Sequence, residues 1–282
     1  MGRARTIGKL SADTFARAGR NKVSIVAAGI AFYVFLGMVP LLAATVLTYG
    51  LIADPSMVAR HVSAMSQALP ASAADLISEQ LRSVVETSDG KKGVGLFIAL
   101  ALALFGARNG AGSVLTALNI AHGVPEGRNF LKANAVALAI TAGGVLAVIA
   151  AVAAMGTLSA LSAYVSAGSA AAGTALTYGL TTALGIAGAA VLYRYAPNRA
   201  PPDWKMVLPG AVLASLGWLL LTLLFGIYVA NFGNYNATYG SLSAVVILLT
   251  WLYFSAMILL LGAELNAAWG DHRKGYDGLA VG

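Results

Sequence analysis

The sequence contains no cysteine, which excludes a disulfide-stapled fold, a thiolate zinc site and a cysteine nucleophile. Charge is also scarce, because Asp, Glu, Lys and Arg make up 10% of the chain, whereas soluble domains carry roughly a quarter. Since 59% of the residues are hydrophobic, this scarcity does not indicate disorder, which requires low hydrophobicity and high charge. The composition therefore disfavours a cytosolic enzyme and favours a membrane protein.

Three long segments, residues 23–53, 133–193 and 206–263, contain no Asp, Glu, Lys, Arg or His. A helix needs about 20 apolar residues to cross the hydrocarbon layer, so the first segment can hold one span and the second can hold two. The third is interrupted by a polar, turn-rich stretch at residues 231–240 and can hold two more. A further span has to include Arg108. We predict an all-α, polytopic membrane protein with six transmembrane helices, at residues 26–50, 94–116, 134–157, 173–194, 207–230 and 242–264.

The basic residues predict the orientation of this bundle. Six spans place both termini on one side, which then holds fourteen Lys and Arg residues, while the other side holds Arg60, Arg82, Lys91 and Lys92. Positive residues in short loops favour the cytoplasmic side. We therefore predict cytoplasmic N- and C-termini, and we attribute the net charge of +7 to topology and anionic lipid rather than to nucleic acid.

Two segments differ in composition from the predicted transmembrane domain, residues 23–270. Residues 1–22 are basic and suit a short amphipathic helix, which either lies on the inner leaflet or caps the bundle. Residues 54–92 form a mixed periplasmic insertion, in which a capping-box-like start at Ser72 precedes apolar residues at helical spacing. We expect two amphipathic helices there, on the outer side, and a cytoplasmic tail over residues 271–282.

No set of residues indicates catalysis or a metal site. The short glycine pairs at 93–95 and 110–112 lack the third glycine and the preceding strand of a dinucleotide-binding turn. His61, His122 and His272 fall in different loops on two sides of the membrane, so they cannot share a zinc ion. We expect no enzymatic activity, no metal and no cofactor.

Two charged side chains are predicted at membrane depth, where charge is costly and marks candidate functional residues. Arg108, followed by Asn109, either needs an anionic or carbonyl partner or snorkels to the inner interface. Glu264 ends the last span, where its charge opposes the helix dipole. Its expected partner is an arginine such as Arg108 or Arg194, and the pair serves either as a structural lock or as a coupling site.

Other candidates are polar or aromatic. Tyr33 and Pro40 place a kink in the first span, whose freed carbonyls either coordinate a substrate or only bend the helix. Trp251 is expected to be a packing residue whose polar indole N–H is buried. In the predicted outer hairpin, Tyr239 is expected to be an interfacial anchor or headgroup ligand and Asn236 a headgroup donor, whereas Gly240 is expected to have a structural role.

Several stretches carry a family resemblance: residues 28–41, 107–119, 195–198 and, above all, 239–266 with its Gly-Ala-Glu-Leu-Asn ending. They resemble the YihY/virulence factor BrkB family of bacterial inner-membrane proteins, once mislabelled ribonuclease BN, over roughly residues 20–270. The resemblance implies six helices, cytoplasmic termini and a role in lipid or lipopolysaccharide handling or transport. No acidic or histidine cluster suited to metal-assisted phosphodiester cleavage supports the ribonuclease label.

The leading hypothesis is a transporter or translocator of a lipid-like, anionic amphiphile in the inner membrane. Its headgroup is expected near the cationic and polar candidates, which are Arg108, Asn109, Tyr33, Arg194, Tyr239 and Asn236. One alternative is a non-transporting envelope assembly protein that binds a protein partner. Another is a small-solute or ion exporter that uses Glu264.

Overall fold

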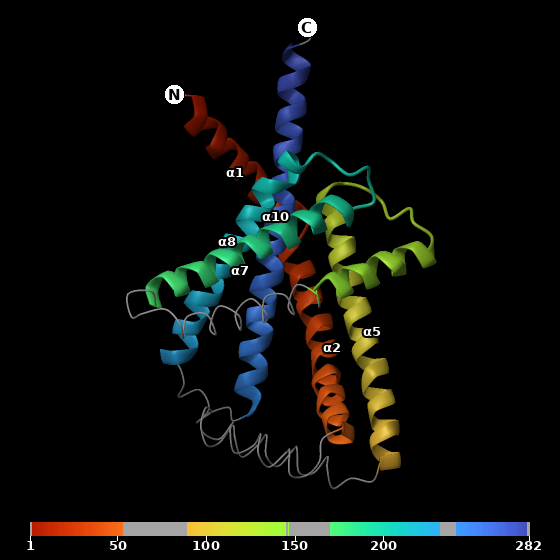
Figure 1. The fold of residues 1–282 in the computed structure, drawn as a ribbon. Helices are drawn as coiled ribbons and strands as arrows, with labels where there is room; N and C mark the ends of the chain where they lie inside the picture. Colours follow the sequence, from red (N-terminus) through yellow and green to blue (C-terminus); the bar gives the residue numbers. More distant parts are fainter. Residues whose placement is uncertain (1, 53–88, 145, 147–169, 232–240, 281–282) are drawn as a thin grey trace. The chain divides into compact units, whose positions relative to one another are not determined.

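The computed structural model describes residues 2–52, 89–144, 146, 170–231 and 241–280, and every regular element in these ranges is a helix (Figure 1). The labelled helices are α1 (Gly2–Arg20), α2 (Val23–Ile52), α5 (Asp89–Ala121), α7 (Ala170–Tyr195), α8 (Trp204–Asn231) and α10 (Ser241–Ala280). A shorter helix covers Phe130–Gly144.

Four helical segments are long and apolar enough to cross a membrane, namely Val94–Ala121, Ala175–Tyr195, Trp204–Tyr228 and Val245–Arg273. A fifth candidate is the bent pair Gly8–Arg20 and Val23–Met38, whose two halves meet at 63°. The predicted third span is described as far as Gly144 and residue 146. The described ranges therefore form a polytopic, all-α membrane protein with four candidate spans, or five if the bent pair is one span.

Two predicted features lie outside the described residues. One is most of the insertion at 54–92, with its two amphipathic helices. The other is the hairpin that contains Asn236, Tyr239 and Gly240.

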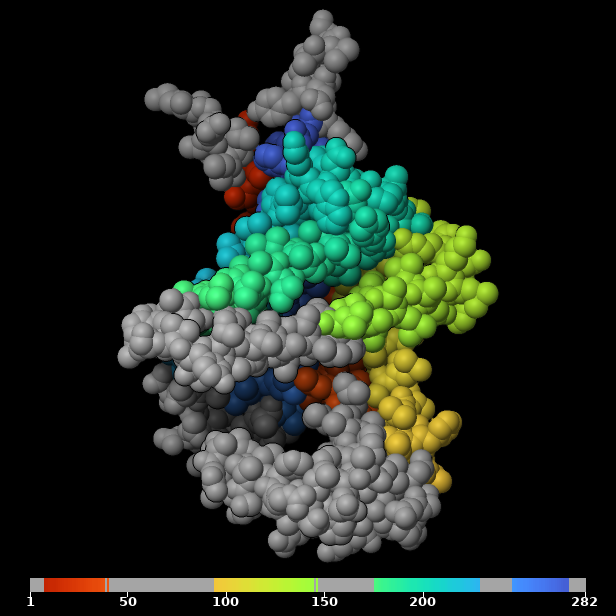
Figure 2. Space-filling model, in the orientation of Figure 1, coloured from red at the N-terminus to blue at the C-terminus, as the bar shows by residue number. Residues whose placement is uncertain are grey.

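The helix formed by Phe130–Gly144 presents apolar side chains to its surroundings. Phe130 and Leu131 are 74% and 76% exposed, and on the face shown in Figure 2 this helix, in yellow-green, is uncovered along its length. Exposed apolar side chains on this scale are unusual for a soluble monomer. They fit a helix that faces lipid.

The described chain divides into two compact units, one formed by Met1–Phe32 and Arg108–Gly282 and the other by Tyr33–Ala107. In the second unit, α2 and α5 approach each other at two glycines. A Cβ atom on Gly37 would lie 2.9 Å from the Ala107 nitrogen, so only glycine fits this crossing. Pro40 lies inside α2, which continues to Ile52.

Small residues also dominate the core of the first unit. One buried cluster joins α5, α7, α8 and α10, and the other joins the α1–α2 corner to α5 and α10. Small side chains let helix backbones come close enough for dispersion contacts to hold them together in lipid. The fully buried members of these clusters are Ala27, Leu118, Tyr193, Val207, Ala211 and Ala263.

Two loops of the first unit are bound to each other. Arg128 donates to the carbonyl oxygens of Ala196 and Pro197, at 2.9 Å each. The Asn198 backbone donates to Asn119 Oδ1 at 2.7 Å. The end of α1 lies beside them, because Arg17, in its last turn, donates from Nη2 to the carbonyl of Ala121, the last residue of α5, at 3.3 Å. We call this side of the unit the loop end; it comprises residues 21–22, 122–129 and 196–203.

The turn between α1 and α2 is tight. Lys22 has a φ of 51°, a left-handed conformation that few residues with a Cβ atom adopt. The Asn21 backbone nitrogen still donates to the Arg17 carbonyl at 2.8 Å, so the helical hydrogen bonding of α1 continues up to the turn. The 63° bend of the pair follows from this turn.

Candidate functional site

The segment Gly262–Asn266 of α10 places polar side chains in the core of the first unit. Glu264 is 1% exposed and Asn266 is 4% exposed. Each residue turns an α-helix by about 100°, so Gly262 and Asn266 share one face and Glu264 lies on another. The segment therefore contacts different neighbours on its two sides.

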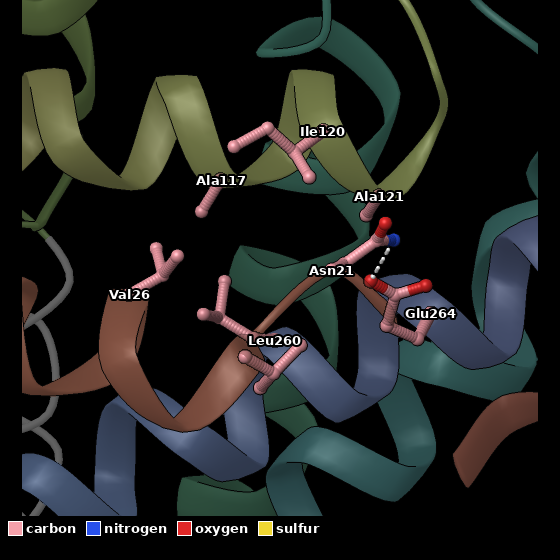
Figure 3. A pocket seen from close by; sticks show the side chains of 8 residues that line it. Asn21, Val26, Ala117, Ile120, Ala121, Leu260 and Glu264 are labelled. Atoms are coloured by element: carbon pink, nitrogen blue, oxygen red, sulfur yellow. Dashed lines mark hydrogen bonds between the residues drawn. The ribbon is translucent and has the colours of Figure 1, made fainter. Parts of the chain in front are cut away.

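Glu264 is held at the corner between α1 and α2. Its Oε1 accepts a hydrogen bond from Asn21 Nδ2 at 2.7 Å (Figure 3), and its Oε2 lies 3.6 Å from Arg17 Nε. Arg17 also bonds to Asp271 Oδ2 at 2.8 Å. The buried carboxylate of Glu264 therefore has two partners: the guanidinium of Arg17, in the last turn of α1, and the side-chain amide of Asn21, in the turn that follows.

The predicted partners of Glu264, Arg108 and Arg194, are not the ones found. The arginine beside Glu264 is Arg17, which precedes the first predicted span. The prediction was right about the kind of partner and wrong about its identity. Spacing along the chain indicates that a buried charge needs a partner, but it does not show which distant helix supplies it.

A small pocket lies beside Glu264 (Figure 3), and its cavity volume is about 10 Å³, the space of about one water molecule. Binding sites for small molecules usually measure about 300–1,000 Å³. The polar side chains that line the pocket, Asn21 and Glu264, are already hydrogen-bonded to each other. The arrangement favours a structural junction at Glu264. The apolar lining comes from α2, α5 and α10, and consists of Val23, Val26, Ala117, Ile120, Ala121 and Leu260.

We expect Glu264→Gln to lower the free energy of unfolding by about 1–3 kcal/mol. Glutamine can still accept from Asn21, but it loses the charge that attracts Arg17. Thermal unfolding in detergent measures the change. Arg17→Gln is expected to be destabilising too, and the double variant should lose less than the sum of the two single losses, because each single change leaves one charge unpaired. Strictly additive losses would show that the two side chains do not interact.

A second polar group, which we call the Arg108 site, consists of Arg108, Asn109 and Asn134. Arg108 Nε donates to Asn134 Oδ1 at 2.8 Å and Nη1 donates to Asn109 Oδ1 at 2.9 Å. Arg108 is exposed and lies near the middle of the candidate span Val94–Ala121. Both of these partners are neutral amides, so neither balances the guanidinium charge.

Asn134 was not among the predicted site residues. The signal that could have found it is a polar amide close to the start of the charge-free segment 133–193. An amide in such a segment needs a hydrogen-bond partner, and Arg108 is the partner in the structure.

Arg194 is engaged at the loop end. Its Nη1 donates to the Pro202 carbonyl at 2.6 Å, and its guanidinium lies 4.5 Å from the ring centroid of Trp204 and 5.4 Å from that of Tyr195. Cation–π contacts at these distances are favourable. Arg194 therefore fastens the loop at 196–203 to the ends of α7 and α8.

A neutral histidine occupies the same end. Burial first, and then the positive charges of Arg199 and Arg17, lower the pKa of His122 from 6.5 to about 3. Arg199 Nη2 lies 3.3 Å from His122 Nε2. The neutral imidazole can therefore accept a hydrogen bond from Arg199 at physiological pH.

Asn266 binds the backbone of α8 on both sides of Pro209. Pro209 lies inside that helix and interrupts its hydrogen bonding. Asn266 Oδ1 accepts from the Gly210 nitrogen at 2.7 Å, and its Nδ2 donates to the Val207 carbonyl at 3.0 Å. The carbonyl that loses its donor at Pro209 is that of Lys205, four residues earlier, so Asn266 does not replace that bond; it ties the backbone of α8 to α10 beside the proline.

Two described candidates remain, Tyr33 and Trp251. Tyr33 is half-buried in α2, within the second unit. Trp251 packs edge-on against Trp218, with ring centroids 5.9 Å apart. Among the described residues, no group of three or more His, Asp or Glu side chains is placed to hold a metal ion.

The sequence pattern of the virulence factor BrkB family matches residues 14–279. The ribonuclease-like protein YfkH of Bacillus subtilis is 28% identical over 216 residues, which are 74% of this chain and 77% of that protein. A UPF0761 membrane protein of Tolumonas auensis is 41% identical over 88 residues, 31% of this chain and 29% of that protein. A UPF0761 membrane protein of Pseudoalteromonas translucida is 35% identical over 92 residues, 33% of this chain and 29% of that protein.

The matches to the two UPF0761 proteins thus span less than a third of their length, and the names of these relatives describe membrane proteins without an activity. No solved structure matches the chain. The family pattern, in contrast, covers nearly the whole sequence, including the segment that holds Glu264 and Asn266. The predicted resemblance is therefore confirmed, and this chain belongs to the virulence factor BrkB family of integral membrane proteins.

Proposed function

We propose that this protein is a transporter or translocator of an anionic, lipid-like amphiphile, and that the headgroup is bound at the Arg108 site. The observation that carries the proposal is an exposed guanidinium on a candidate membrane span, bonded to two neutral amides. The proposal assigns no enzymatic activity to the chain.

Arginine stays charged at all physiological pH values and has five N–H donors. Asn109 and Asn134 take two of these donors and fix the plane of the guanidinium. An uncompensated charge in the hydrocarbon layer is costly, and phosphate or carboxylate oxygens pair well with a guanidinium fork. An anionic headgroup that arrives along the protein surface would supply the missing negative charge.

We also propose that the protein crosses a bacterial inner membrane six times and has both termini on the cytoplasmic side. The loop end supports an even number of crossings, because it gathers the α1–α2 turn and the loops at 122–129 and 196–203. The end of α10 is at this side as well, since Asp271 binds Arg17. The fourteen-to-four distribution of Lys and Arg favours the cytoplasm for that side.

Lipid exchange in proteoliposomes tests the proposal. We expect the native protein to accelerate the exchange of a fluorescent phosphatidylglycerol between leaflets, relative to empty vesicles. Arg108→Gln should slow the protein-dependent rate about tenfold, because a hydrogen bond to a charged group contributes roughly 1.5–3 kcal/mol. Lys205→Gln is the matched control, since it removes one exposed positive charge at the start of α8 and should leave the rate unchanged.

Two results would contradict this function. The native protein could exchange the lipid no faster than empty vesicles do. Alternatively, the Arg108→Gln protein, equally well folded, could exchange the fluorescent lipid as fast as the native protein does. Glu264 has no transport role in the proposal, because its carboxylate is already matched to Asn21 and Arg17.

A further inference from the structure

Helix α1 has one face that is bound to the rest of the first unit. Thr14 and Ala18 are buried, and Arg17, which lies on the same face beside Thr14, pairs with Glu264 and Asp271. This inner face accounts for the attachment of α1 to α5 and α10.

The same helix is bound to α10 at a second place. Asp13 Oδ2 lies 2.7 Å from His272 Nε2, so the acidic side chain at the edge of the inner face has a partner. The negative charge of Asp13 is therefore directed at α10.

The opposite face of α1 is apolar and uncovered. Its exposed residues recur every three or four positions, which places them in one stripe along the helix, and they are Gly8, Ala12, Phe15, Ala16 and Gly19. Phe15 is 67% exposed. A large ring on a stripe of small residues is available to enter an apolar layer.

Basic side chains border this stripe. Lys9 and Arg20 are both exposed, and because they are eleven residues apart they point to the same side of the helix. Lys22, in the turn that follows, is exposed too. The edge of the apolar stripe thus carries a positive charge near each end of the described helix, and the acid between them, Asp13, is paired with His272.

The direction of α1 fits the surface of a membrane. Its axis makes an angle of 63° with Val23–Met38. If that segment crosses the bilayer, α1 runs closer to the membrane plane than to the membrane normal. An apolar face bordered by Lys and Arg is the pattern of helices that lie in the headgroup layer.

We infer that α1 is an interfacial helix that binds an anionic phospholipid surface with its outer stripe. Phe15 enters the boundary between headgroups and acyl chains, while Lys9, Arg20 and Lys22 contact phosphate groups. The inner face holds the helix on the protein at the same time. This inference does not rest on the proposed transport function, because α1 can bind lipid whether or not the protein moves any.

The absence of cysteine allows a direct test with single spin labels on the full-length protein in nanodiscs. Ala12→Cys places a label on the stripe, and Ala200→Cys places a control label on an exposed loop residue. The depth of each label is measured from its collision rates with oxygen and with a water-soluble nickel complex. In nanodiscs with phosphatidylglycerol, we expect the label at 12 to lie about 5–10 Å into the interface and the label at 200 to remain in water.

Charge variants then test the part played by the anionic lipid. The fraction of phosphatidylglycerol is raised stepwise in phosphatidylcholine nanodiscs until the label at 12 is half inserted. Each of Lys9→Ser, Arg20→Ser and Lys22→Ser should raise the required fraction, since each basic residue contributes about fivefold to binding at an anionic surface. Phe15→Ser should reduce the depth of the label even at high phosphatidylglycerol.

Two outcomes would overturn the inference. In one, the label at 12 stays in water at every lipid composition, while an unchanged unfolding temperature shows that the inner face of α1 is intact. In the other, the label is immobilised equally in detergent and in both lipids, which would identify a protein contact as the occupant of the stripe.

Discussion

Asn266→Leu is expected to lower the free energy of unfolding by about 2–6 kcal/mol. Leucine has the same branching and the same number of side-chain heavy atoms, but it leaves the Gly210 N–H and the Val207 carbonyl without the partners that Asn266 gives them. Each unpaired buried polar group costs about 1–3 kcal/mol, and both groups lie within two residues of Pro209, where the backbone of α8 is already disturbed. Thermal or denaturant unfolding in detergent measures the loss.

Thr250→Val is the matched control for this variant, since it also exchanges a polar side chain on α10 for an apolar one of similar size. Thr250 Oγ1 bonds to the Val246 carbonyl of its own helix at 2.7 Å, so no second helix depends on it. We expect a change of less than about 0.5 kcal/mol, as for substitutions away from such networks. An equal effect of the two variants would show that Asn266 has no special role in α8.

Gly210→Ala is expected to prevent stable packing of α8 on α10, with a loss of at least about 3 kcal/mol. A Cβ atom at this position would collide with the Gly262 carbonyl oxygen and lie 2.6 Å from Asn266 Cγ. The first of these atoms belongs to a backbone, which cannot rotate away as a side chain does. The yield of monodisperse protein and its unfolding temperature should both fall.

Gly226→Ala on the same helix is the control. No atom lies within 4 Å of a Cβ placed there, and alanine is more favourable than glycine inside a helix by roughly 0.8–1 kcal/mol. We expect Gly226→Ala to be neutral or slightly stabilising. A Gly210→Ala protein as stable as Gly226→Ala would mean that α8 and α10 do not pack backbone to backbone.

The helices could be predicted from the sequence because a transmembrane helix needs an uncharged, apolar segment of about 20 residues. The predicted span at 207–230 corresponds to α8, Trp204–Asn231. The predicted end at 264 of the last span is wrong as a helix end, because α10 continues to Ala280. Its extension is stabilised by packing, since Ala267 and Ala268 are buried, and packing leaves no signal in hydropathy.

The site could be predicted in part. Glu264 and Arg108 were recognisable because each is a charge within or at the end of an apolar segment. Their partners could not be predicted, because Arg17 and Asn134 lie on other helices. Residue spacing shows which side chains share a face of one helix, but it does not show which side chains of two helices meet. Asn266 belongs to a segment that resembles the family, but its role depends on backbone groups of a different helix, α8.

The contact between Glu264 and the α1–α2 corner also sets an order for biosynthesis. Asn21 and Glu264 are 243 residues apart, and translation proceeds at about 5–20 residues per second. The corner between α1 and α2 is therefore synthesised about 10–50 seconds before Glu264, and during that time Arg17 has neither of its carboxylate partners, Glu264 and Asp271. A chain released by the ribosome before residue 264 would insert its early helices and still lack the contact that closes the corner.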